Sequence, residues 1–192
     1  MKPWLVSYFA PFAGAATNSS QIVLEKAKRP RNVRLKGPLP VEFNGSWQAL
    51  QALLERDSYR GAVIFGQAMG RVKLSLERVA FNWRDASLAD ERGYQPLGEK
   101  IVNGDEARWS NIPWDDFTEN EFAGRSYSAG AFVCNEIMYR LIEYAEPRGI
   151  LSGFVHVPVL ESQVGFSLGT KTMREDLAIR ETERVLGFLA GL

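Results

Sequence analysis

Residues 126–158 read SYSAGAFVCNEIMYRLIEYAEPRGILSGFVHVP and contain the only cysteine, Cys134, and the only histidine, His156, of the chain. Cys134 follows a turn of small residues, Ser128-Ala129-Gly130, and lies at the beginning of a run whose apolar side chains recur at helical spacing. The unpaired N–H groups and the dipole of a helix start favour a thiolate over a thiol. The pattern therefore predicts a nucleophilic cysteine with a lowered pKa in the first turn of a helix.

His156 belongs to a β-branched and aromatic run that stops at Pro158, which predicts the end of a strand following the cysteine helix. In a strand-helix-strand unit, the helix start and the end of the second strand lie at the same edge of the sheet. We therefore expect Cys134 and His156 to meet there. The alternative to a catalytic pair is that Cys134 is an inert buried side chain and that His156 is a hydrogen-bonded residue of the core or surface.

Composition limits the size and the partners of the protein. The chain has 192 residues, of which 45% are hydrophobic and 24% charged, enough for one core and a single domain over residues 1–192. A net charge of zero, with no basic run beyond RPRNVRLK, predicts no nucleic-acid partner. The apolar stretch at the N-terminus is shorter than a signal peptide or a membrane span requires. A single cysteine cannot form an internal disulfide. These features predict a cytoplasmic protein that does not associate with membranes.

Strand and helix patterns alternate along the chain. The expected strands are residues 4–8, a short exposed strand within 29–40, residues 62–65, and a strand or hairpin over 72–81 that changes face near Leu76-Glu77. Besides the cysteine helix, helices are expected over about 18–28, 45–56 and 172–189. We therefore predict an α/β fold, a three-layer sandwich whose mixed, mostly parallel sheet is flanked by helices. Residues 84–120 and 160–171 are expected to be loops, the first of them a lid over a site.

A cysteine-histidine pair needs a third group that orients the imidazole, and Glu77 is the candidate. It lies in an apolar strand context, where an unpaired carboxylate would be costly. Burial would be favourable if Glu77 accepted the histidine N–H. The alternative is that Glu77 pairs with Arg78 or faces water.

Four blocks of the sequence resemble the pyroglutamyl peptidase I family, also called pyrrolidone-carboxylate peptidase, over nearly the whole chain. The blocks are YFAPFAGAATNSS (8–20), GQAMGR (66–71) with LERVAFNWRDA (76–86), SAGAFVCN (128–135) and GFVHVP (153–158). The resemblance implies a cysteine exopeptidase that releases N-terminal pyroglutamate through a thioester acyl-enzyme. It also implies peptide substrates that begin with pyroglutamate, no metal or other cofactor, and a homo-oligomer of two or four chains.

The same resemblance assigns roles to residues at matching positions. Its catalytic triad falls on Glu77, Cys134 and His156. The pyrrolidone ring would lie between Phe9 and Phe12, with Gln67 at its polar edge, further pocket wall from Leu88, Phe132 and Val133, and Asn18 bracing the phenylalanine loop.

The chain departs from the family pattern at several positions near these residues, and Tyr8 and Ala13 replace glycines of the N-terminal motif. Ser87 stands where the family commonly carries an arginine close to the reacting cysteine, and Arg71, Arg84 or Arg92 are the candidates to replace it. Glu136 gives FVCNE where bacterial members have FVCNH. The alternative hypotheses are a divergent homologue that binds pyroglutamyl-like ligands or acts on another acyl substrate, and a relic triad without function.

Overall fold

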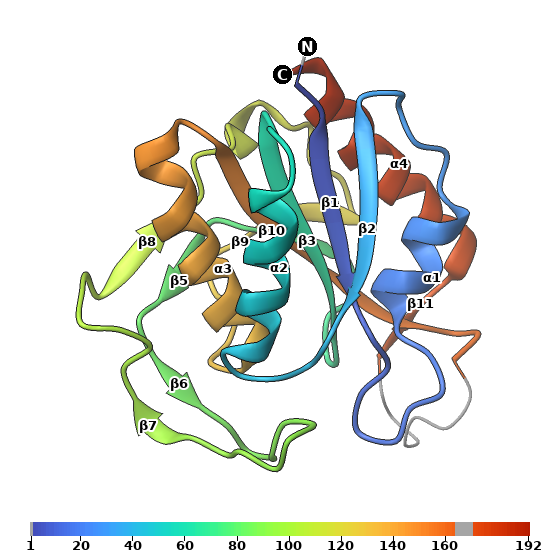
Figure 1. The fold of residues 1–192 in the computed structure, drawn as a ribbon. Coiled ribbons are helices and arrows are strands. Elements are labelled where there is room, and N and C mark those ends of the chain that lie inside the picture. The colour runs from blue at the N-terminus through green and yellow to red at the C-terminus, as the bar shows by residue number, and fades with distance from the viewer. Residues whose placement is uncertain (1, 164–170) are drawn as a thin grey trace.

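The computed structural model describes residues 2–163 and 171–192 and is built on a seven-stranded sheet (Figure 1). The strand order is β2-β1-β3-β10-β4-β9, with β11 beside β10. The strands are β1 (Trp4–Phe9), β2 (Val33–Leu39), β3 (Gly61–Ala68), β4 (Leu74–Glu77), β9 (Ala123–Ser126), β10 (Leu151–Leu160) and β11 (Thr172–Met173). Neighbours are parallel except β10 and β4, which are antiparallel, so the predicted mixed, mostly parallel sheet is confirmed.

Helices cover both faces of this sheet, as predicted. They are α1 (Ser19–Lys26), α2 (Gly45–Glu55), α3 (Val133–Ala145) and α4 (Glu175–Gly191), with short 3-10 turns η1 (Trp114–Asp116) and η2 (Glu146–Arg148). In Figure 1, α2 and α3 lie in front of the sheet, and α1 and α4 pack together on its other face. Asn18 is the N-cap of α1, and its side-chain oxygen accepts the N–H of Ser20 at 3.0 Å. None of the described helices has the length and apolar character needed to cross a bilayer.

Two apolar layers flank the sheet, because its central strands are buried on both faces. All six residues of β1 are buried, as expected of a parallel strand that is covered by helices on both sides. Trp4 and Phe65 pack in the layer under α1 and α4, whereas Ile64 and Phe154 pack in the layer under α2 and α3. Burying each such side chain stabilises the fold by about 1.5–3 kcal/mol.

Several predicted boundaries were wrong. His156 lies inside β10 and not at its end, because the strand continues past Pro158 to Leu160 and pairs with β11. The last helix begins at Glu175, since Thr172 and Met173 form β11. The strand expected over 72–81 is divided at Arg78, the residue between β4 and β5 (Val79–Phe81), and β5 leaves the main sheet to pair with β8 (Ala107–Trp109).

Residues 84–120 are more ordered than the predicted loops. They contain β8, η1 and the paired strands β6 (Arg84–Asp85) and β7 (Leu97–Glu99). Trp114 is fully buried and stacks on Phe188 of α4, with ring centroids 5.8 Å apart. The buried Asn82 side chain also holds this segment by accepting the N–H of Val102 at 3.0 Å. Of the loop expected over 160–171, residues 164–170 lie outside the described part of the chain.

Candidate active site

The central contact of the site joins Glu77 on β4 to His156 on β10. The antiparallel register places Glu77 opposite Phe154, two residues before His156, so both side chains project from the same face of the sheet. Glu77 Oε1 lies 2.8 Å from His156 Nδ1, and the two residues are 0% and 4% exposed. An ionised carboxylate only accepts, so Nδ1 carries the hydrogen and Nε2 is left as a base. Arg78, the alternative partner of Glu77, pairs with Asp115 instead.

Cys134 is the second residue of α3 and approaches the same face of the sheet. The parallel register of β3 and β10 pairs Gly66 with His156, about 4.8 Å apart across the sheet. A Cβ added to Gly66 would lie 3.1 Å from Cys134 Sγ and only 2.7 Å from Phe154 Cζ. Paired residues of parallel strands point to the same face, so the sulfur lies beside the histidine strand on the side from which the imidazole projects. Glycine at position 66 leaves the space that this approach requires.

Burial raises the pKa of the Cys134 thiol to about 12, and the negative charge of Glu77 adds to the effect. The backbone N–H of Cys134 acts in the opposite direction and favours the thiolate, as a helix start should. The predicted lowering of this pKa was therefore wrong, because the loss of solvation outweighs the helix start. A thiolate must instead form by proton transfer to a nearby base.

Replacement of His156 by glutamine is expected to slow alkylation of Cys134 by iodoacetamide at pH 7 about 100-fold or more, because general-base assistance is typically worth that much. The rate in the variant should recover only as the pH rises toward the thiol pKa of about 12. Mass spectrometry of the single cysteine measures both rates, and the urea-unfolded proteins should react equally. Equal native rates in the two proteins would contradict a role of His156 as the base.

The two predicted ring-binding phenylalanines lie in different surroundings. Phe9 is the last residue of β1, is 2% exposed, and packs on Phe154 with ring centroids 6.4 Å apart. Phe12 lies in the following loop and packs on Phe132 at 5.3 Å. Phe132 in turn meets Phe43 edge-on at 5.2 Å. An aromatic wall formed by Phe12, Phe132 and Phe43 therefore adjoins the start of α3, and Phe43 is a member that the sequence analysis missed.

The two polar residues assigned near this loop use their side chains within the protein. Asn18 donates to the Ala10 carbonyl at 2.9 Å, a contact that braces the loop between Phe9 and Phe12. The Gln67 side chain points to the opposite face of the sheet from Gly66, where its oxygen accepts the Ser19 N–H at 2.8 Å. The backbone of Gln67 is therefore the part of this residue that can face a ligand beside Cys134.

The remaining predicted pocket residues, Val133 and Leu88, differ in exposure. Val133 is fully buried in the layer under α3, whereas Leu88 is 39% exposed in the segment after β6. Residues of this segment reach the phenylalanine loop, since the Glu91 carboxylate accepts the Ala13 N–H at 3.2 Å. The contact places the segment after β6 against the loop that carries Phe12.

Ser87 is exposed, and two of the three arginines considered as replacements are engaged elsewhere. Arg84 donates to Glu136 at 2.8 Å, and Arg92 pairs with Glu42 at 2.7 Å. Arg71, in contrast, reaches the Glu-His pair: its Nη2 lies 3.2 Å from Glu77 Oε1.

A buried ionic cluster surrounds Glu136, two residues after the cysteine. Glu136 is 1% exposed and accepts from Arg84 Nη2 at 2.8 Å, Arg140 Nε at 2.9 Å and the Asn44 N–H at 3.2 Å. The neighbouring Asn135 is also fully buried and bonds to the backbone of β5. The sequence analysis did not predict that Asn135 and Glu136 are buried and hydrogen-bonded. Two adjacent polar residues at the start of an apolar helix could have indicated it.

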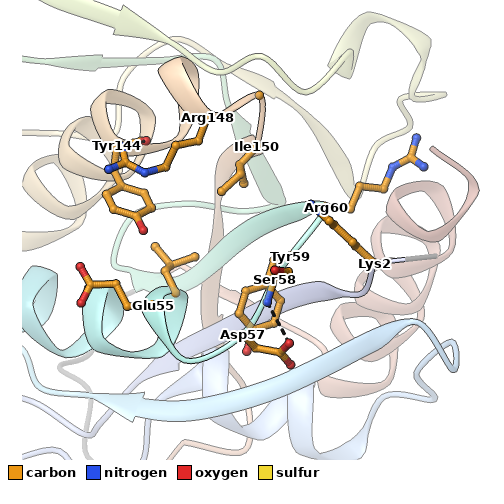
Figure 2. Close-up of a pocket in the computed structure, with 11 residues that line it drawn as sticks. Lys2, Glu55, Asp57, Ser58, Tyr59, Arg60, Tyr144, Arg148 and Ile150 are labelled. Carbon is orange, nitrogen blue, oxygen red and sulfur yellow. Dashed lines mark hydrogen bonds between the residues drawn. The ribbon is translucent and has the colours of Figure 1, made fainter.

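A separate cavity of about 720 Å³ lies at the opposite edge of the sheet (Figure 2). Its lining includes Lys2, Arg60 and Ile150, which lie one or two residues before the starts of β1, β3 and β10. Figure 2 shows Tyr144 and Arg148 on one side of this cavity and Lys2 and Arg60 on the other. Open α/β sheets bind ligands at the carboxyl ends of their strands, the edge toward which Gly66 and His156 lie. The cavity is therefore distinct from the candidate active site.

Comparisons with known proteins agree with this geometry. Residues 2–183 match the family described as Pyroglutamyl peptidase. The pyrrolidone-carboxylate peptidase of Klebsiella pneumoniae is 36% identical over 191 residues, covering 90% of this chain and 88% of the relative. That of Bacillus cereus is 32% identical over 204 residues, covering 96% and 94%.

Solved structures show the same fold. The crystal structure of pyroglutamyl peptidase I from Bacillus amyloliquefaciens superposes with a TM-score of 0.88 at 27% identity, covering 100% of this chain and 98% of the other. Pyrrolidone carboxyl peptidase from Thermococcus litoralis gives 0.87 at 28% identity, covering 100% and 94%.

An α/β sheet that brings a buried Glu-His pair to a cysteine at a helix start, with these relatives, defines a cysteine peptidase. More narrowly, the chain belongs to the pyroglutamyl peptidase family.

Proposed function

We propose that this protein hydrolyses the bond after an N-terminal pyroglutamyl residue, with Cys134 as nucleophile, His156 as general base and acid, and Glu77 as the group that orients His156. The observation that carries the proposal is the 2.8 Å contact between Glu77 and His156. It lies next to Gly66, the residue of β3 over which the Cys134 sulfur lies. A buried carboxylate in this place fixes the imidazole tautomer with Nε2 free to accept the thiol proton.

The reaction then follows from the geometry. Cys134 Sγ attacks the carbonyl carbon that joins the pyroglutamyl ring to the next residue, and its proton passes to His156. The Cys134 N–H lies in the first turn of α3 and can donate to the oxyanion, a contribution of about 100-fold in rate for one such donor. The intermediate collapses to a thioester as His156 protonates the leaving amine. Water, deprotonated by His156, then hydrolyses the thioester, which releases pyroglutamate and restores the thiol.

Selectivity for pyroglutamate would come from aromatic surface and a few hydrogen bonds, because the lactam carries no charge to pair with. Phe12 and Phe132 form an aromatic pair beside the start of α3. Ring faces of this kind bind a flat, neutral five-membered ring through dispersion and excluded water. The contact between Glu91 and Ala13 supports a role for the segment after β6 in covering this pocket.

The direct experiment is release of aminomethylcoumarin from its pyroglutamyl amide, compared with the prolyl and glutaminyl amides. We expect turnover of the pyroglutamyl amide alone, because a proline amine or an open glutamine side chain lacks the lactam. Binding of pyroglutamate is measured in parallel as a rise in melting temperature. A rise without any turnover would contradict the peptidase and would favour a binding protein.

We also infer that the protein works in a reducing compartment such as the cytoplasm, because its single cysteine must remain a free thiol for this chemistry. A homo-oligomer of two or four chains is a further prediction from the family resemblance. Size-exclusion chromatography with light scattering measures the assembly state.

A further inference from the structure

Arg71 is a charged residue of the site to which the proposed mechanism gives no task. It lies between β3 and β4, directly after Gly70, whose φ of +83° reverses the chain at a turn. Its Nη2 lies 3.2 Å from Glu77 Oε1 and donates to the Ser128 carbonyl at 2.6 Å. The side chain is 34% exposed, so the guanidinium closes the solvent side of an otherwise buried carboxylate.

We propose that Arg71 is a positioning residue that sets the charge balance of the Glu77–His156 pair and fixes the turn leading to the Cys134 helix. This inference rests on the proposed function, because it assigns Arg71 a task in the same reaction.

The charge balance follows from the contacts of Glu77. Its Oε1 contacts both His156 Nδ1 and Arg71, while Oε2 is buried without a hydrogen-bond partner in the described residues. Two titratable groups face His156: Glu77 from β4 and Cys134 from α3. Arg71, in the β3–β4 turn, acts on His156 through Glu77. The neighbouring strand β3 contributes only the uncharged Gly66. Arg71 is the permanent cation in this set. Without it, the only cation beside the Glu77 carboxylate would be the imidazolium that forms when His156 accepts a proton.

The positional part follows from the second contact. Ser128 lies in the turn of small residues before α3, and its hydroxyl accepts the Gly130 N–H at 3.3 Å. A single guanidinium nitrogen therefore links the acid of the triad to the segment that leads into the cysteine helix. This link couples the position of Cys134 to that of His156, although the two lie on different elements.

The test compares Arg71→Met, Arg71→Gln and Arg71→Lys with the wild type. The matched control is Arg174→Gln at the N-cap of α4, a helix that packs on the opposite face of the sheet from Cys134. Arg174 is an exposed arginine that pairs with an aspartate, as Arg71 pairs with a glutamate. Two readouts are measured against pH: kcat/KM for the pyroglutamyl amide and the rate of Cys134 alkylation by iodoacetamide. Melting temperatures establish that each variant is folded. If Arg71→Met does not fold, Arg71→Gln alone serves as the uncharged variant.

We expect the acid limb of both profiles to move up by about one pH unit in the two uncharged variants, since removing a neighbouring cation favours the positively charged form of the imidazole. The value of kcat at the optimum should fall about tenfold, with KM changed by less than about twofold, as for loss of alignment in the transition state. Arg71→Lys should restore the acid limb, and Arg174→Gln should match the wild type.

The inference is overturned if the uncharged Arg71 variants lower kcat without moving either limb of the pH profiles, or if they move the acid limb down. The alkylation profile keeps this outcome separate from a failure of the proposed function. If the wild type releases no coumarin, the peptidase proposal fails, while the alkylation rates still report whether Arg71 sets the protonation of the Cys134–His156 pair.

Discussion

Cys134→Ser is expected to lower kcat/KM for a pyroglutamyl amide by about 10⁴-fold or more, because removal of a covalent nucleophile leaves only binding and oxyanion stabilisation. Serine is nearly isosteric, but its hydroxyl is far harder to deprotonate than a thiol, so His156 cannot generate the alkoxide at a useful rate. The measurement is coumarin release at enzyme concentrations high enough to detect the residual rate. Cys134→Ala should reduce the rate to the same floor.

Ligand binding provides the control for this prediction. Phe12, Phe132 and the backbone near Gly66 are unchanged in both cysteine variants, so we expect pyroglutamate to raise the melting temperatures of the variants and of the wild type by the same amount. Residual activity within tenfold of the wild type in either variant would exclude Cys134 as the nucleophile.

Glu77→Gln is expected to lower kcat by about 10²–10³-fold, because an amide can neither stabilise the imidazolium nor enforce the tautomer with Nδ1 protonated. The acid limb of the pH profile should move down, since loss of the neighbouring negative charge disfavours the imidazolium form of the base. This direction is opposite to that expected for Arg71→Met, so the two variants together separate an electrostatic effect from a loss of packing.

The matched control is Glu121→Gln, which neutralises an exposed carboxylate in the turn before β9. It should leave both the rate and the pH profile unchanged. A Glu77→Gln protein that keeps wild-type kcat would contradict the assignment of Glu77 as the orienting group, whatever its melting temperature.

The sequence predicted the architecture because the strands and helices carry distinct periodicities. The apolar runs at 4–8 and 62–65 became central strands, and the helical spacing after Cys134 became α3. Glu77 was recognised because a carboxylate in an apolar strand needs a partner, and the structure supplies His156. These inferences depend on local pattern and on the general rule for sheet edges.

Features that depend on tertiary surroundings could not be predicted in this way. The thiol pKa was expected to fall at a helix start, but its direction is decided by burial between α3 and the sheet. His156 was placed at a strand end because Pro158 reads as a terminator, whereas the added strand β11 extends the sheet beyond it. The polarity around Trp114 predicted a loop, although this residue fills a gap against α4 that only the folded chain creates.

The charged side chains of the Glu136 cluster depend on one another, so the residues around the nucleophile cannot be exchanged one at a time. A histidine at position 136 alone would remove the carboxylate that Arg84 and Arg140 share and would leave Glu99, which is half-exposed, to pair with Arg84. Removing one partner of a buried ion pair is strongly destabilising. A chimera with a bacterial relative would therefore need to exchange the segments around residues 44, 84, 136 and 140 together.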